Sequence, residues 1–288
     1  MKIEEIRLDM CSTYPISTKW FNGQITRDGA LLLIETHHQE EIDFSLSNQD
    51  CTITLIKDGN VRKIELKNIP ISPTDADIFS DGSLLLVQGR CSTDGAKMEP
   101  NAQIYNLEGQ LMDTFLLGDG ISQVQIDETD TIWVSYFDEG IFGAIDDLEP
   151  MGADGLAAYS KSGQKLWGAK EYEMADCYAM NIVSSKEVNF YYYDQYKLVQ
   201  LKDFMETACY VVEGDDTFQQ FLFDQQDLLV EIDCDTLMRY NISNQTIIPA
   251  GNVTFVDDKG KRISGHVLMR GKLLYVFCKD RLYKKEFL

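Results

Sequence analysis

The sequence predicts one all-β domain over residues 1–288, a β-propeller of six four-stranded blades, and three observations support this. A turn signal followed by a short apolar strand recurs six times along the chain. Strand-like segments precede and follow these copies, and no long stretch has the 3.6-residue apolar period of an amphipathic helix. Closing such repeats into a ring hides the sheet edges that otherwise invite aggregation.

The repeated turn and strand form the second strand of each unit. The copies lie at 28–33, 81–86, 130–134, 186–192, 226–230 and 270–276. Their spacing of about 40 to 57 residues is near that of known propeller blades. Each copy is preceded by an expected inner strand, at 23–27, 76–80, 123–127, 180–184, 218–223 and 266–269.

A hairpin follows each of the first five copies and supplies the third and fourth strands. The pairs are 52–57 with 61–66, 103–107 with 110–116, 156–160 with 165–168, 198–201 with 209–212, and 237–240 with 246–249. Turns such as Asp58-Gly59 and Ser162-Gly163 supply the positive-φ residues that tight hairpins favour.

The sixth unit lacks a fourth strand, because only the segment 282–287 follows its second strand. The N-terminal segment 3–8 is expected to pair there and to close the ring. Seven blades remain an alternative if the irregular segment 36–50 contains further strands.

The connections between second and third strands are long in units 1 to 3 (36–51, 91–102 and 137–155) and short afterwards. Long loops on a rigid scaffold are where binding usually occurs. The functional face is therefore expected at this end of the propeller. Its acidic residues are Glu40, Glu41, Asp43, Asp138, Glu139, Asp146, Asp147, Glu149, Asp154, Asp194, Asp215 and Asp216.

The formal net charge of −21 disfavours nucleic acid and anionic membranes as partners. It permits a basic protein or peptide, or a divalent cation, and it also fits a solvated acidic rim that binds nothing.

The seven cysteines are odd in number and form no Cys-x-x-Cys motif, as expected of reduced thiols. The sequence shows no signal peptide and no membrane-length apolar run, so we expect a soluble cytoplasmic protein.

No cofactor is predicted, and a divalent cation is the alternative. His37-His38 is interpreted as an exposed loop pair, and no calcium-binding loop motif is present. Cys177 lies between residues that give it no activating base, so an inert thiol is expected. The inner strands carry polar residues that predict a water-filled channel, although Asp77 and Asn181 are also suitable metal ligands. These residues are Gln24, Asp77, Gln123, Gln125, Asn181, Gln219 and His266.

Two stretches carry a resemblance to a known group of proteins. They are Ile-Trp-Val-Ser-Tyr-Phe-Asp-Glu-Gly-Ile-Phe-Gly at 132–143 and Asp-Cys-Tyr-Ala-Met-Asn at 176–181, the latter followed by the aromatic segment 190–199. They resemble segments of uncharacterised bacterial six-bladed β-propeller-like proteins, over about residues 120–202. That group has no assigned activity, so the resemblance supports the fold and not a reaction.

Both stretches are expected at the long-loop end, between neighbouring blades. The predicted binding residues are Tyr136, Asp138, Glu139, Asp176, Tyr178, Asn181 and Asp194. The leading hypothesis is a non-catalytic binding module for a basic protein or peptide, one version being an immunity-type protein. A metal-dependent hydrolase or lactonase acting in the channel and a structural assembly component are the alternatives.

Overall fold

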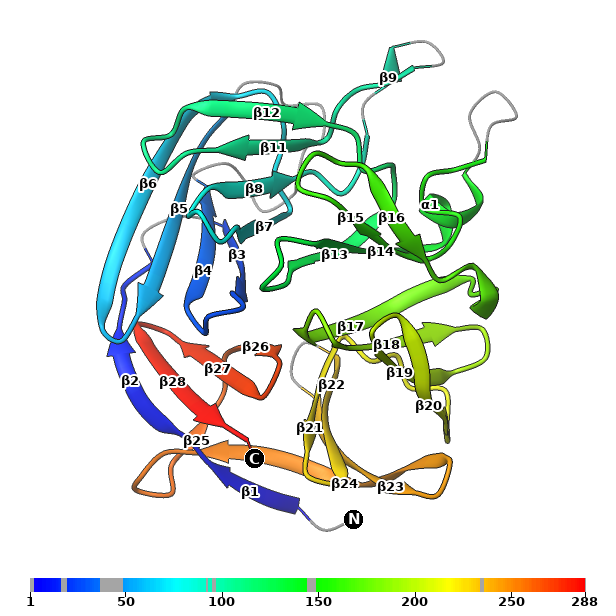
Figure 1. Cartoon of the computed structure of the whole chain (residues 1–288). Coiled ribbons are helices and arrows are strands. Elements are labelled where there is room, and N and C mark those ends of the chain that lie inside the picture. The colour runs from blue at the N-terminus through cyan, green and yellow to red at the C-terminus, as the bar shows by residue number, and fades with distance from the viewer. Residues whose placement is uncertain are drawn as a thin grey trace.

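The chain folds into a β-propeller. The computed structural model describes residues 3–16, 20–36, 49–91, 93–94, 97–143, 149–233 and 236–287. Within these ranges the strands pair into six four-stranded meanders that surround one axis (Figure 1), and we call them blades I to VI. The predicted fold class is thus confirmed. The segment 37–48, on which a seventh blade depends, lies outside the described residues.

Each blade of the first half runs from an inner strand at the axis to an outer strand. Blade I contains β3 (Trp20–Ile25), β4 (Leu31–Thr36), β5 (Gln49–Lys57) and β6 (Asn60–Ile69). Blade II contains β7 (Asp75–Ile78), β8 (Leu84–Val87), β11 (Ala102–Tyr105) and β12 (Leu111–Phe115). Blade III contains β13 (Ile121–Ile126), β14 (Ile132–Tyr136), β15 (Leu156–Tyr159) and β16 (Lys165–Gly168).

The second half repeats this plan, except that a strand from the N-terminal part of the chain completes the last blade. Blade IV contains β17 (Asp176–Ser184), β18 (Glu187–Tyr193), β19 (Lys197–Lys202) and β20 (Met205–Val212). Blade V contains β21 (Gln220–Asp224), β22 (Asp227–Asp233), β23 (Thr236–Ser243) and β24 (Thr246–Val256). Blade VI contains β26 (His266–Arg270), β27 (Leu273–Cys278) and β28 (Arg281–Glu286), completed by β2 (Asp9–Thr13). Blades IV and V also touch through a two-residue parallel pairing of β20 with β24.

The remaining elements are short. They are the hairpin β9 (Thr93–Asp94) and β10 (Lys97–Met98), the strand β25 (Arg262–Ile263), the helix α1 (Asp138–Phe142) and the 3-10 helix η1 (Lys170–Tyr172). Among the described residues, no helix has the length and apolar character needed to span a membrane.

The second strand of each blade is deeply buried, which explains the apolar runs in the repeat. All residues of β4, β8 and β14 are buried, because both faces of the strand pack against neighbouring blades. The outer strand β12 is exposed over most of its length. The core therefore lies between the blades and thins toward the rim.

The N-terminus closes the ring, but with a different segment from the one predicted. The predicted closing segment 3–8 forms β1 (Ile3–Arg7), which pairs in parallel with β24 of blade V. Closure is made by β2, which pairs antiparallel with β28 (Figure 1). The prediction followed the apolar side chains of the segment 3–8, two of which, Ile6 and Leu8, flank blade V and are buried. The closing strand is mostly exposed and so needs few apolar residues.

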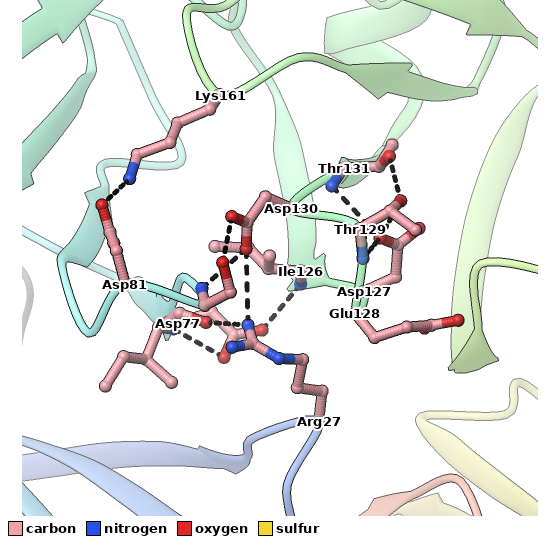
Figure 2. Close-up of polar contacts among 12 residues, drawn as sticks. Arg27, Asp77, Asp81, Ile126, Asp127, Glu128, Thr129, Asp130, Thr131 and Lys161 are labelled. Atoms are coloured by element: carbon pink, nitrogen blue, oxygen red, sulfur yellow. Dashed lines mark hydrogen bonds and ion pairs between the residues drawn. The ribbon is translucent and has the colours of Figure 1, made fainter.

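The turns between first and second strands lie at one end of the molecule, the short-loop face. In blades I to III these turns contact one another (Figure 2). Arg27 donates a hydrogen bond of 2.6 Å to the carbonyl of Ile78, and its guanidinium lies 3.7 Å from the carboxylate of Asp130. Lys161, in the turn between the third and fourth strands of blade III, pairs with Asp81 of blade II at 2.6 Å. The contacts join different blades, so this face stabilises the ring.

The opposite end, the long-loop face, carries the connections between second and third strands. As predicted, these connections are long in blades I to III and short in blades IV to VI. The connection of blade III contains α1, whose Gly140 packs against Gly120 in the loop that enters the blade. A Cβ atom added at Gly120 would lie 2.3 Å from the Gly140 nitrogen. The two loops are therefore held together by close backbone contact.

Candidate functional site

The inner strands hold one another through side chains across every junction between blades. A backbone group at the edge of an inner strand needs a hydrogen-bond partner once it is buried. In each junction, a polar side chain of one blade bonds a backbone group of the next. The pairs are Gln24 with Ala76, Asp77 with Ile126, Gln125 with Ile182, Asn181 with Phe221, Gln220 with Val267, and Arg270 with Ile25. We call this set the latch ring.

The latch ring gives a structural role to residues that were expected to line a water-filled channel. Asp77 is fully buried and Asn181 is 1% exposed. The amide nitrogen of Asn181 donates to the carbonyls of Phe221 and Gly271, at 3.0 and 3.1 Å, and its oxygen accepts from the Gly271 N–H at 2.6 Å. Neither side chain is placed to bind a ligand.

Arg270 crosses the axis toward the short-loop end of the channel. Its guanidinium donates to the carboxylate of Asp77 at 2.7 Å, and also to the carbonyls of Ile25 and Ile126. These partners belong to blades I, II and III, whereas Arg270 belongs to blade VI. The channel is thus spanned by a buried ion pair at this end.

At the long-loop end the channel opens into a cavity of about 580 Å³, which we call the mouth. Its walls come from the inner strands of all six blades and from the ends of three second strands. Titratable residues in the wall are Asp75, Arg90, Glu231 and His266, and amides line much of the remainder. Such a concave, central pocket with a few convergent polar groups is the default place for a ligand.

Asp75 is a titratable residue of the mouth whose pKa is raised. It lies at the start of β7, where its side chain is partly buried. Burial raises the pKa of its carboxyl to about 7, although hydrogen bonds from the Thr74 side chain and the Val124 backbone oppose this. Within the described residues no ion pair joins Asp75 to a basic side chain. Burial also lowers the pKa of His266, which favours the uncharged imidazole.

A shallower hollow of about 280 Å³ adjoins the mouth and shares Ser122, Gln123, Phe137 and Gln219 with it. Asp176 and Tyr178, two of the predicted binding residues, line this hollow. Burial, together with the nearby carboxylate of Asp138, raises the pKa of Asp176 to about 6. The structure therefore brings the two predicted acids Asp138 and Asp176 together at the rim of the channel.

Arg90 also lies at the mouth, but its charge is already balanced. Its Nε donates to Asp119 at 3.1 Å and its NH1 donates to Glu139 at 2.6 Å. The guanidinium lies over the ring of Phe137, 5.5 Å from the ring centre. Glu139, a predicted site residue, is therefore paired with a basic group of the protein itself.

The other predicted binding residues are divided between core and surface. Tyr136 is fully buried, and its hydroxyl bonds the Leu117 carbonyl and lies 2.8 Å from the hydroxyl of Tyr159. Its side chain is part of the core of blade III. Asp194 is exposed and follows Tyr193, whose ring centre lies 5.8 Å from that of Tyr178. It therefore lies next to the hollow, outside its wall.

Some residues at the mouth are not among the predicted ones. Asp75 lies one residue before the expected inner strand at 76–80, and Glu231 lies one residue beyond the second strand expected at 226–230. Extending both strands by one position would have found them. No signal in the sequence indicated that Arg90 reaches the mouth.

Other expectations concern the acids of the long-loop face, a metal, and Cys177. Glu40, Glu41, Asp43, Asp146, Asp147 and the pair His37-His38 lie outside the described residues. Among the residues that are described, no group of three or more His, Cys, Asp or Glu side chains is placed to hold a metal ion. Cys177 is fully buried, and burial raises the pKa of its thiol, which agrees with an inert cysteine.

The fold has counterparts among solved structures. Virginiamycin B lyase from Staphylococcus aureus matches with a TM-score of 0.54 and 12% identity, over 92% of this chain and 80% of that chain. A streptogramin B lyase matches at 0.52 and 10% identity, over 96% of both chains. The β-propeller domain of Cps50 (Swd1) from Myceliophteria thermophila matches at 0.50 and 9% identity, over 98% of this chain and 99% of that domain.

These likenesses show a shared fold. At such low identity they carry no activity from the lyases to this chain. The model of the YxzG family matches residues 151–285, which is less than half of the chain. No curated protein matches.

Proposed function

We propose that the protein is a non-catalytic binding module whose long-loop face docks a basic protein or peptide. One observation carries this proposal. The mouth and the adjoining hollow form a continuous depression on the propeller axis, and the carboxyls of Asp75 and Asp176 line it. Among the described residues neither carboxyl has a basic partner within the chain. A partner that supplies positive charge would satisfy both groups.

The charge of the whole chain supports the same kind of partner. A net charge of −21 attracts a basic molecule over a distance and speeds its encounter. An aromatic ring beside the acids adds a surface on which a cation can pack, because Tyr178 lines the hollow that also contains Asp176. The Phe137 ring in the same hollow is already covered by the guanidinium of Arg90. The proposal thus combines long-range attraction with a local acceptor for basic side chains.

We assign this module to the cytoplasm. Cys11, Cys51, Cys91, Cys177, Cys209 and Cys278 are free thiols. Free thiols in this number are typical of a reducing compartment. Cys234 lies outside the described residues.

Fluorescence anisotropy with labelled twelve-residue peptides tests the proposal. A peptide rich in lysine and arginine should bind the full chain at 20 mM salt, whereas a peptide rich in glutamate should not. Binding should weaken at least about tenfold at 300 mM salt, because the charges are then screened. The proposal fails if the basic peptide does not bind at low salt, or if the acidic peptide binds equally well.

A matched pair of variants locates the binding surface. D138N with D176N removes two acids from the rim and should weaken binding of the basic peptide about fivefold to tenfold. D58N with D113N makes the same change in net charge at exposed positions away from the long-loop face, and should leave affinity within about twofold. Equal losses in both double variants would mean that net charge alone drives binding.

A further inference from the structure

The mouth contains a partly buried carboxyl, that of Asp75, which has no basic partner among the described residues and lies where the channel reaches the long-loop face. Asp75 is partly reachable from the cavity and is hydrogen bonded by the Thr74 side chain and the Val124 backbone. A carboxylate surrounded by protein is normally paired with a cation. Among the described residues, the chain supplies none to Asp75.

The other groups that face the mouth favour a ligand that donates hydrogen bonds. Glu231 is 6% exposed, and its Oε2 accepts from the Gln220 amide at 2.9 Å. Gln24 also lines the cavity, and its buried Oε1 has no donor among the described residues. A buried acceptor without a donor is unfavourable. A ligand that donates several N–H groups complements this set of acceptors.

The two basic residues of the mouth do not oppose a cation. Arg90 is held by Asp119 and Glu139, which balance its charge. Burial lowers the pKa of the His266 imidazole and so favours its uncharged form. The like charge of Asp77, on the same strand as Asp75, is in turn held by Arg270 at 2.7 Å. The remaining charge in the mouth is therefore negative.

We infer that the mouth is a pocket for one basic side chain of the partner, a lysine ammonium or an arginine guanidinium, which pairs with Asp75. This inference rests on the proposed function and adds to it the place and the residue of recognition. The acids at the rim, Asp138 and Asp176, attract the partner, and Asp75 receives its side chain. The long-loop face thus binds one basic side chain at its centre, and the acids around the centre attract the partner electrostatically.

Pairing with a cation has a measurable consequence at Asp75. In the free protein its carboxyl has a pKa of about 7, so a substantial fraction is protonated at neutral pH. A basic side chain beside it favours the charged form and lowers the pKa. Binding at pH 7 must then release protons to the buffer.

Isothermal titration calorimetry of the full chain with the basic peptide tests this. At pH 7 the observed heat should differ between phosphate and Tris, whose ionisation enthalpies differ, by an amount that reports proton release. D75N should weaken affinity about tenfold and should abolish the dependence on buffer. D113N, a carboxyl-to-amide change on the outer strand β12, should alter neither quantity. Peptides with a single arginine, lysine or citrulline then separate guanidinium from ammonium recognition.

The outcomes separate the two proposals. If the peptide binds wild type and D75N alike and releases no protons, the pocket at Asp75 is wrong, while loss of binding in D138N with D176N still supports docking at the rim. If no basic peptide binds the wild type, the proposed function fails and this inference fails with it. The buffer comparison uses wild-type protein, so a D75N variant that folds poorly would not leave the inference untested.

Discussion

The guanidinium of Arg270 in blade VI donates a hydrogen bond of 2.7 Å to the carboxylate of Asp77 in blade II, across the propeller axis. Both side chains are buried, at 3% and 0% exposure. Removing one partner of a buried ion pair leaves an uncompensated charge, which is strongly destabilising. The relationship explains how blades distant in sequence are fixed around the channel.

We predict that R270M lowers the free energy of unfolding by about 3–5 kcal/mol, because Asp77 then stays buried without its cation. D77N should cost less than R270M, since the amide can still accept a hydrogen bond from Ile126. Urea unfolding followed by tryptophan fluorescence measures both. R62M, on the exposed outer strand β6, should change stability by less than about 0.5 kcal/mol. An R270M protein as stable as wild type would contradict the assigned role.

Asn181 gives a second test of the latch ring. N181D keeps the shape of the side chain but places a carboxylate against the carbonyls of Phe221 and Gly271, which now receive its amide protons. We expect a loss of about 2–4 kcal/mol, from two lost hydrogen bonds and a buried charge. The same change at the exposed turn residue Asn244 should be nearly neutral. If N181D is as stable as wild type but binds the basic peptide differently, Asn181 belongs to the binding surface after all.

The closing strand can be tested by truncation. Removing residues 1–7 deletes β1, whereas removing residues 1–13 deletes β2 as well and exposes the edge of β28. The first truncation should lower the melting temperature but leave a cooperative transition. The second should give a less cooperative transition and aggregation, because an exposed edge pairs with other chains. Size-exclusion chromatography and calorimetry distinguish the two, and equal behaviour would contradict closure by β2.

The fold could be predicted because its signals are local. The leucine runs at 31–33 and 84–86 report second strands that are buried on both faces, and Asp-Gly turns mark the ends of strands. The closing strand was misassigned because an exposed outer strand has no apolar pattern to recognise. Apolar periodicity selected Ile6 and Leu8, which are indeed buried, but against blade V.

The site could be predicted only in part. The positions of loops at one face brought Asp138 and Asp176 together correctly, because that depends on topology alone. Tyr136 and Asn181 were placed in the same set, but both are buried. Which way a side chain points depends on strand register, and which groups it meets depends on the neighbouring blade. Neither is encoded by a local pattern, so the latch ring and the place of Asp75 in the mouth could not be predicted from the sequence.

The raised pKa of Asp75 makes a prediction about stability and pH. Its carboxyl has a pKa of about 7 in the folded protein, against 3.8 as the ordinary value. The folded state therefore binds this proton more tightly, so the contribution of Asp75 to stability is greatest below pH 4 and is lost as pH rises through 7. D75N, which is neutral throughout, should be more stable than wild type at pH 8 by about 1–2 kcal/mol and equal to it near pH 3.5. Melting temperatures from pH 3.5 to 8 check this, with D113N expected to follow the wild type. A D75N curve that runs parallel to the wild-type curve at all pH values would mean that Asp75 titrates normally and is not desolvated in the mouth.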